Sequence, residues 1–208
     1  MVRMNQTTKH GFVCAALAAL SLAGCGSPEE PATPTTAPVL SSSGPTTTTE
    51  QPWPTLEPGA DLPEAADAAV DRTDPEQVAL ETIRIIHTRD TTVEPQSGDS
   101  FARAADLMTG KLRDELIVDS SSARPSMQWS EWMKREATIA AETAIMVEEH
   151  PADEPDRWRR AVEVDEYVTA ANGSKIGQFR VVHYLDVRNE DGEWRVDGIS
   201  FGERLPAR

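Results

Sequence analysis

Apolar residues in the second half of the chain recur first at helical and then at strand spacing. Between residues 74 and 89, apolar positions three and four residues apart predict a helix. Asp74 suits the N-cap and Pro75 the first turn. Two shorter helical segments are expected at 101–108 and 112–118, separated by an interruption at Gly110.

From residue 137 onward the pattern becomes an alternation of apolar and polar positions, which predicts strands. Four long strands are expected at about 137–147, 158–170, 176–188 and 193–201, with residues 128–132 leading into the sheet. Asn172-Gly173 is the strongest hairpin signal, because a type I′ turn needs positive φ at both central positions, and Asp191-Gly192 predicts the next turn. Helices followed by these strands predict an α+β domain, with N-terminal helices packed on a curved four-stranded antiparallel sheet.

The first 24 residues have a different pattern, in which a basic start precedes an uncharged run. Arg3 and Lys9 come before the apolar and small residues at 11–24. A membrane-spanning helix needs about 20 apolar residues; this run is shorter and ends in small residues, as a secretory signal does. We expect residues 1–24 to be a signal peptide. The alternative is a short buried helix of the domain.

The residues Leu22-Ala23-Gly24-Cys25 resemble the lipobox of bacterial lipoproteins at all four positions, and such lipoproteins are common in actinobacterial envelopes. The resemblance implies that a diacylglycerol thioether forms on Cys25 and that the chain is cut just before it. Two acyl chains suffice for stable anchoring, so the protein would sit on the extracytoplasmic face of the cell membrane. The alternative is an ordinary secretory cut that leaves Cys25 as a free thiol.

A Pro- and Thr-rich stretch follows the cysteine and extends to about residue 60. It has few apolar side chains besides Val39, Leu40, Trp53 and Leu56, so it cannot bury enough surface to offset the entropy of ordering. We expect a disordered tether over residues 25–60 and a folded domain over residues 61–208. The Thr and Pro content also suits O-glycosylation, and the sequence leaves that point open.

Charge and cysteine content narrow the possible functions. The chain has 20 Lys and Arg against 35 Asp and Glu; removing Arg3 and Lys9 with the signal leaves 18 basic residues and a net charge of −17. This balance disfavours binding to nucleic acid, which relies on neutralised phosphates, and docking of the domain on anionic lipid. With Cys14 removed and Cys25 lipidated, no disulfide, cysteine zinc site or catalytic cysteine is expected in the domain.

The order of elements and the closing sequence Gly192-Glu193-Trp194-Arg195-Val196-Asp197 resemble the NTF2-like (cystatin-like α+β) superfamily. The helical segment from Phe101 to Met108 fits the same pattern, and the resemblance covers about residues 74–203. It implies a cone formed by helices and a curved sheet. The superfamily includes isomerases, ligand carriers and protein-binding members, so the fold assigns no function.

One histidine stands among the apolar positions of the third predicted strand. His183 shares its face with Val181 and Leu185. Enzymatic members of the superfamily place an acid–base pair inside the cone, which makes His183 and Asp106 the catalytic candidates, with His87 or Asp90 as alternative partners from the helices. The candidates for lining a ligand pocket are His183, Val181, Leu185 and His87. The alternative is a core histidine with satisfied hydrogen bonds. No Asp and Tyr pair matches the isomerase pattern, and no cofactor or metal is expected.

The leading hypothesis is a membrane-anchored extracytoplasmic lipoprotein whose domain is a non-catalytic interaction or assembly module in the cell envelope. Its partner would be another envelope protein, or a second copy bound through the sheet. The alternatives are a carrier that holds a small apolar ligand in the cone and, less favoured, an isomerase- or hydratase-type enzyme.

Overall fold

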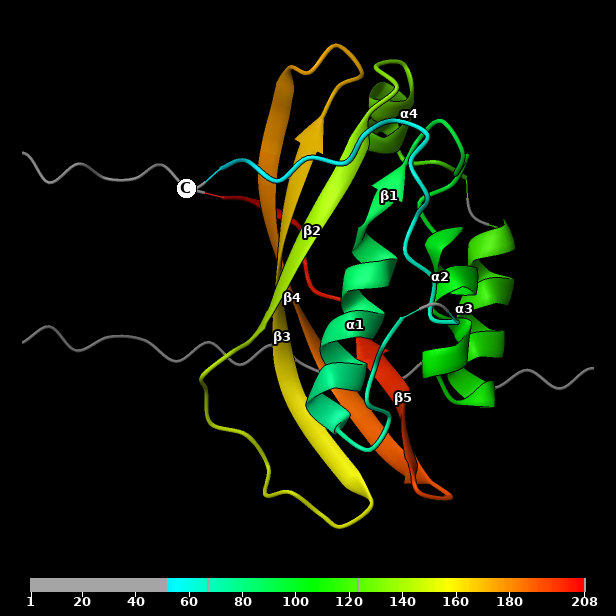
Figure 1. Ribbon diagram of the computed structural model, residues 1–208, viewed down its shortest axis with the longest axis vertical. Helices are drawn as coiled ribbons and strands as arrows, with labels where there is room; N and C mark the ends of the chain where they lie inside the picture. The colour runs from blue at the N-terminus through cyan, green and yellow to red at the C-terminus, as the bar shows by residue number, and fades with distance from the viewer. Residues whose placement is uncertain (1–51, 67, 123, 208) are drawn as a thin grey trace, which may run out of the picture. The chain divides into compact units, whose positions relative to one another are not determined.

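The computed structural model describes residues 52–66, 68–122 and 124–207 (Figure 1). The predicted signal peptide, Cys25 and most of the predicted tether lie outside the described residues. Within the described part of the chain, no helix is long and apolar enough to cross a membrane.

The helical segments all precede the long strands, as the sequence predicts. They are α1 (Pro75–His87), α2 (Ser100–Arg103), the 3₁₀ helix η1 (Ala105–Leu107), α3 (Gly110–Ser122) and α4 (Met127–Met133). Helix α1 starts where the sequence places it, because the Asp74 carboxylate accepts hydrogen bonds from the Glu76 and Gln77 amides.

Two helical predictions differ from the structure. The segment 101–108 is not one helix but α2 followed by η1, and Gly110 begins α3 instead of interrupting a helix. The segment expected to lead into the sheet is the helix α4. The Ser126 hydroxyl caps it by accepting a hydrogen bond from the Trp129 amide at 3.1 Å, and Trp129 and Trp132 are buried. A hydroxyl cap and two tryptophans at i and i+3 suffice for one short amphipathic helix.

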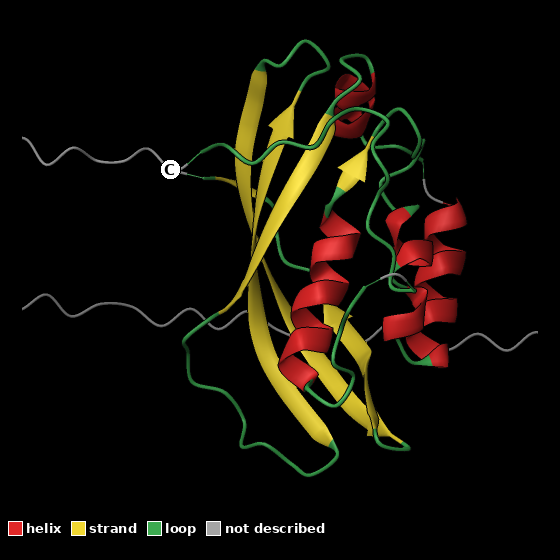
Figure 2. Cartoon of the chain, in the orientation of Figure 1, coloured by secondary structure: helices red, strands yellow, loops and turns green. Residues whose placement is uncertain are grey.

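The sheet is antiparallel and curved, and the helices cover one of its faces (Figure 2). Its strands are β1 (Arg89–Asp90), β2 (Thr138–Ile145), β3 (Arg157–Thr169), β4 (Lys175–Glu190), β5 (Glu193–Ser200) and β6 (Leu205–Pro206). The order is β1-β2-β3-β4-β5, and β6 pairs with β4. The α+β class and the four long strands are confirmed. The prediction of four strands was incomplete, since the two-residue strands β1 and β6 extend the sheet and are too short to leave a period in the sequence.

The type I′ turn that the sequence predicts at Asn172-Gly173 is found instead at Asp191-Gly192. At Asp191-Gly192 both residues have positive φ, 57° and 95°, as a two-residue type I′ turn requires. At Asn172-Gly173 only Gly173 has positive φ among the two. There the Gly173 amide donates to the Ala170 carbonyl, and the Ala170 amide donates to the Ser174 carbonyl. The Asn172-Gly173 hairpin is present, but its loop is longer than a type I′ turn.

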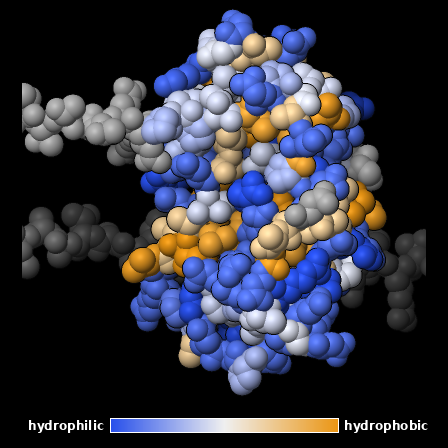
Figure 3. Space-filling model, in the orientation of Figure 1, coloured by the Kyte–Doolittle hydropathy of each residue, from blue (hydrophilic) through white to orange (hydrophobic). Residues whose placement is uncertain are grey.

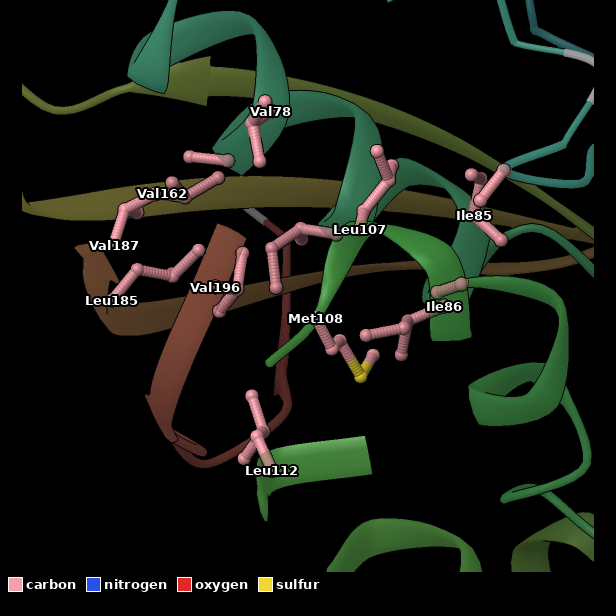
Figure 4. Packing of buried hydrophobic residues seen from close by; sticks show 14 of the residues in the cluster. Val78, Ile85, Ile86, Leu107, Met108, Leu112, Val162, Leu185, Val187 and Val196 are labelled. Carbon is pink, nitrogen blue, oxygen red and sulfur yellow. The ribbon is translucent and has the colours of Figure 1, made fainter. Parts of the chain in front are cut away.

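The core lies between the helices and the inner face of the sheet. Side chains from α1, from the segment around η1, from α3 and from three strands point into one interior (Figure 4). They include Val78, Ile85, Ile86, Leu107, Met108, Leu112, Val162, Leu185, Val187 and Val196, all of them buried. A second cluster joins Trp129 and Trp132 of α4 to Ala137, Ile139 and Val168. Because side chains fill this interior, the predicted cone is a packed core.

Residues 52–60, which the sequence assigns to the tether, pack against the domain. The Trp53 indole donates to the Thr169 hydroxyl at 3.1 Å and contacts the Tyr167 ring edge-on at 5.2 Å. The Thr138 hydroxyl donates to the Leu56 carbonyl at 2.7 Å. The Gly59 amide donates to the Asp90 carboxylate. The ordered domain therefore begins before residue 61, and Trp53 is part of it.

Candidate functional site

Strand β4 presents alternate residues to the two sides of the sheet, and each side has its own chemistry. Val181, His183, Leu185 and Val187 face the helices and are buried. Tyr184 lies between them on the outer side and is 57% exposed. Both sides are candidate functional surfaces.

On the inner side, His183 belongs to a buried network of ionisable side chains. Its Nε2 lies 2.8 Å from Nε2 of His87, at the end of α1. The Nδ1 of His87 lies 2.7 Å from Oε1 of Glu166 in β3. Two guanidinium groups flank the Glu166 carboxylate: Arg89 Nη2 donates at 3.1 Å, and Arg204 Nε donates at 2.6 Å. Glu166 is fully buried, so each of its oxygens needs such donors.

The hydrogen bonds define which ring nitrogens carry protons. The Glu166 carboxylate only accepts, so His87 donates from Nδ1. Because burial disfavours the charged ring and lowers the His87 pKa, its Nε2 is bare. That bare nitrogen accepts from the Nε2–H of His183, which leaves Nδ1 of His183 as an acceptor. The Gly202 amide lies 3.4 Å from Nδ1 and points its proton there. Both histidines are therefore neutral, and one chain of hydrogen bonds runs from Gly202 to Glu166.

Burial and charge together determine the ionisation of this network. The pKa of His183 is lowered to about 3, mainly by burial and next by the neighbouring His87. Burial also lowers the pKa of His87 below its usual value, against the opposing hydrogen bond to Glu166. For Glu166, burial favours the neutral form. The hydrogen bond from His87 and the charges of Arg89 and Arg204 outweigh it, so the Glu166 pKa lies well below the ordinary range.

The C-terminal segment closes the network from solvent. The Phe201 ring stands edge-on to the His183 ring at 5.3 Å and also contacts Phe101. Next along the chain, the Gly202 amide donates to His183. The Arg204 guanidinium then donates to Glu166 and also lies over the Trp132 ring. Strand β6 then joins the sheet. His183 has its outward nitrogen covered, and in this arrangement no substrate reaches it.

The structure separates the two catalytic candidates. Asp106 is exposed in η1, and its carbonyl accepts hydrogen bonds from Arg72 and Arg195. His183 is 1% exposed and bonds to His87. The proposed His183–Asp106 pair is therefore absent from the structure.

The four proposed pocket-lining residues, His183, Val181, Leu185 and His87, are buried. They lie within a packed interior. The alternative stated for His183, a core histidine with satisfied hydrogen bonds, describes what the structure has.

Sequence reasoning missed Glu166, Arg89 and Arg204, and one of them left a signal. Glu166 has the same strand parity as Val162, Val164 and Val168, so it is a carboxylate on the apolar face of β3. An inward acidic residue is rarely buried without a partner. That rule predicts a buried cation or donor nearby, although it does not say which one.

On the outer side, an apolar patch lies between ion pairs. Tyr184 is its centre, with Ala161 paired opposite it in β3 and half-buried Val182 beside it. Tyr184 borders two hollows, of about 520 and 560 Å³. The first reaches Ile199 and the loop at 148–151; the second reaches Leu205, which is 54% exposed.

Three arginines around this patch are each paired with an acidic side chain. Arg157 Nε donates to Asp186 at 2.8 Å, Arg180 Nη2 donates to Asp165 at 2.8 Å, and Arg159 bonds to Glu154 at 2.7 Å. An apolar centre with a polar rim is the usual anatomy of a protein interface.

No protein-family model and no curated protein match the chain. Among solved structures, the chain is similar to one titled "Structure of a periplasmic fragment of TraM". The TM-score is 0.43 at 9% sequence identity, and the match covers 66% of this chain and 98% of that chain. A likeness at that score supports no statement about fold family or function. In the described part of the chain, no cluster of three or more His, Cys, Asp or Glu side chains is arranged to hold a metal ion.

Proposed function

We propose that this protein is a lipid-anchored lipoprotein of the extracytoplasmic membrane face, whose NTF2-like domain is a non-catalytic interaction module in the cell envelope. The outer face of the sheet, centred on Tyr184, is the surface through which it binds. The partner is a second copy of the chain or another envelope protein.

One observation carries this proposal: the two faces of β4 divide into a closed interior and an open apolar surface. The inner residues that would line a ligand cavity are each at most 4% exposed, and the outward nitrogen of His183 is capped. The outer face keeps Tyr184 57% exposed, so most of its surface is not used in packing the fold. Tyrosines are enriched at protein interfaces because their rings give large contact area with a polar tip.

Charge supports a second copy as one occupant. The mature chain has a net charge of −17, so most approaches of two copies are repulsive. Around Tyr184, however, Arg157, Arg159 and Arg180 each neutralise an acidic side chain of the same chain. These pairs reduce the like charge that two copies would bring together, although Glu148, Glu149 and Glu203 also border the two hollows.

The test is site-specific photo-crosslinking in intact cells. A benzophenone amino acid replaces Tyr184 in one variant and Met127 in another. Met127 is the matched control, because it is an apolar residue that is 88% exposed in α4 on the helical side. We expect adducts at position 184 and none at 127, with their mass distinguishing a homodimer from a second protein. Equal adducts at both positions, or none at 184, would contradict the proposal.

The anchoring part has its own test. Cys25→Ser removes the only sulfur that the lipid can use in the mature chain. We expect the wild-type protein in the membrane fraction and the variant in the soluble fraction after export. Retention of Cys25→Ser in the membrane would show that the lipobox interpretation is wrong.

A second candidate function is acid–base chemistry at His183, and the Glu166–His87–His183 chain of hydrogen bonds favours it. A carboxylate that orients one histidine against another is an arrangement found at catalytic sites. It requires displacement of residues 201–204. Gly202→Pro removes the capping N–H and places a Cβ against the Val182 carbonyl oxygen, so it displaces this segment. It should then raise the reactivity of His183 toward diethyl pyrocarbonate and produce turnover. Increased reactivity of His183 without turnover would contradict the catalytic function and leave only the proposed binding function.

A further inference from the structure

In the described part of the chain, most of one edge of strand β2 is not covered by another strand. The Met146 amide donates to the Ala161 carbonyl at 3.0 Å, and antiparallel ladders alternate. Counting back along the register, Ala140, Glu142 and Ala144 exchange hydrogen bonds with β3. The N–H and C=O groups of Ala141, Thr143 and Ile145 therefore point away from β3.

Strand β1 covers only the beginning of this edge (Figure 1). Its two residues pair with Thr138 and Ile139, and the pairing ends there. Within the described ranges, no backbone group pairs with Ala141, Thr143 or Ile145. A row of unpaired peptide groups is a template for another strand, and β2 has neither a proline nor a bulge to prevent such pairing.

A hollow of about 510 Å³ runs along this edge. Thr143 and Ala141 line it from β2 and Arg84 from α1, and α1 is held close because the Thr143 hydroxyl lies 3.4 Å from the Leu80 carbonyl. At the end of the edge, β2 continues into half-buried Met146 and fully exposed Val147. Hydrophobic side chains also gather across the middle of the face shown in Figure 3, on an otherwise hydrophilic surface.

The charges beside the edge of β2 favour a basic binding partner. Glu142, Glu163 and Asp165 line the same hollow. Arg180 pairs with both Glu163 and Asp165, so three carboxylates face one guanidinium there. Arg84 adds no free positive charge, because Glu81 neutralises it. A second copy joined edge to edge would bring two such acidic rows together, which is repulsive. A peptide with Lys or Arg at alternate positions is attracted.

We propose that the free edge of β2 binds an extended, basic peptide segment of a partner protein by antiparallel strand addition. The backbone groups of Ala141, Thr143 and Ile145 form the ladder, and Glu142, Glu163 and Asp165 receive the basic side chains. This is one of the recurring modes of peptide recognition. The inference rests on the proposed role as an interaction module but uses a different surface from Tyr184.

Amide hydrogen exchange on the full mature chain tests the edge directly. Without peptide, the amides of Ala141, Thr143 and Ile145 should exchange fast while those of Ala140, Glu142 and Ala144 are protected. The probe is the blocked hexapeptide Val-Lys-Val-Arg-Val-Lys, with Val-Glu-Val-Asp-Val-Glu as its acidic counterpart. The basic peptide should protect the three fast amides, and the acidic one should not. If the three amides are already slow in the free protein, the edge is covered and the proposal is wrong.

Two variants separate strand addition from charge attraction alone. Thr143→Pro removes an N–H that points to the free edge, where proline is tolerated, and should weaken the Kd of the basic peptide about tenfold. Glu142→Lys should weaken it about tenfold as well, and the matched control Glu115→Lys, exposed in α3, should change it by less than about twofold. Equal losses in both Lys variants, or full binding by Thr143→Pro with an unchanged unfolding curve, would overturn strand addition. Tyr184→Arg should leave peptide binding intact, so failure here and failure at the outer face are distinguishable.

Discussion

His183 and Tyr184 are neighbours in sequence and lie in opposite environments. His183 is 1% exposed, neutral, and hydrogen-bonded on both ring nitrogens. Tyr184 borders two hollows in the open. The same period of two that builds the strand therefore produces one side specialised for cohesion and one available for contact.

The ion pairs on the two sides of the sheet also differ in how strongly they depend on their partners. Glu166 lies inside with no exposed side-chain surface and depends on Arg89, which is itself 6% exposed. Asp186 lies outside, where it and Arg157 keep 23% and 34% of their side-chain surface. Water can replace Arg157 as a partner of Asp186, and no water replaces Arg89 and Arg204 around Glu166. Removing an inner carboxylate should therefore cost far more than removing an outer one.

The largest expected effect comes from Glu166→Gln. It leaves the buried Arg89 guanidinium without the carboxylate that it bonds to, and among the described residues the Nε of Arg89 already has no hydrogen-bond partner. We expect a loss of about 3–5 kcal/mol in the free energy of unfolding, measured by urea denaturation. The matched outer substitution is Asp186→Asn, for which we expect a loss below about 1 kcal/mol. Equal losses would remove the distinction between the two faces.

A smaller difference in the free energy of unfolding is expected between variants of the neighbours Leu185 and Tyr184. Leu185→Ala empties part of the core and should cost about 2–5 kcal/mol. Tyr184→Ala should change the free energy of unfolding by no more than about 0.5 kcal/mol, because the ring is mostly exposed. The measurement is again urea denaturation at neutral pH. A large loss from Tyr184→Ala would mean that the outer face serves the fold and not a partner.

The smallest effect is a pH dependence that belongs to the inner side. The His183 pKa is about 3 when folded and near its usual 6.5 when unfolded, so below 6.5 the unfolded chain binds a proton that the folded one does not. Stability is therefore complete above pH 6.5 and falls as the pH drops toward 3. The expected slope is about 1 kcal/mol per pH unit for this group.

The measurement compares the wild type with His183→Asn between pH 7 and 5, a range above the titration of most carboxylates. The variant should have the shallower slope, because it has lost one of the two buried imidazoles. An unchanged slope would show that His183 does not couple to folding.

The sequence predicted the fold better than the site, for a physical reason. The periodicity of Val162, Val164 and Val168 is a local property, so strands and their buried faces can be inferred from it. The Asp74 cap and the Asp191-Gly192 turn are also local, and both are confirmed. Strand β6 forms only because Leu205 and Pro206 pair with Arg180 and Phe179 of β4. No pattern in the residues around Leu205 predicts that pairing.

The site depends on long-range pairing. His183 was rightly placed inward, and His87, 96 residues away, was named as one possible partner. The other members of the network, Glu166 and Arg204, are 17 and 21 residues from His183 in the chain. Asp106 was chosen because it lies on a helix near the strands, and helix proximity does not bring its carboxylate inward. The signal that existed was Glu166 itself, a charge at a position where its strand is otherwise apolar.

The packing of Trp53 on the sheet has a mechanical consequence. Its ring is held between Tyr167 and the ammonium group of Lys175, 4.6 Å from the ring centroid, and its N–H is held by Thr169. If Cys25 is fixed in a bilayer, tension along the chain enters the domain at this residue. The load then falls on the end of the β3–β4 hairpin, which has the longest ladder of the sheet, before it reaches α1.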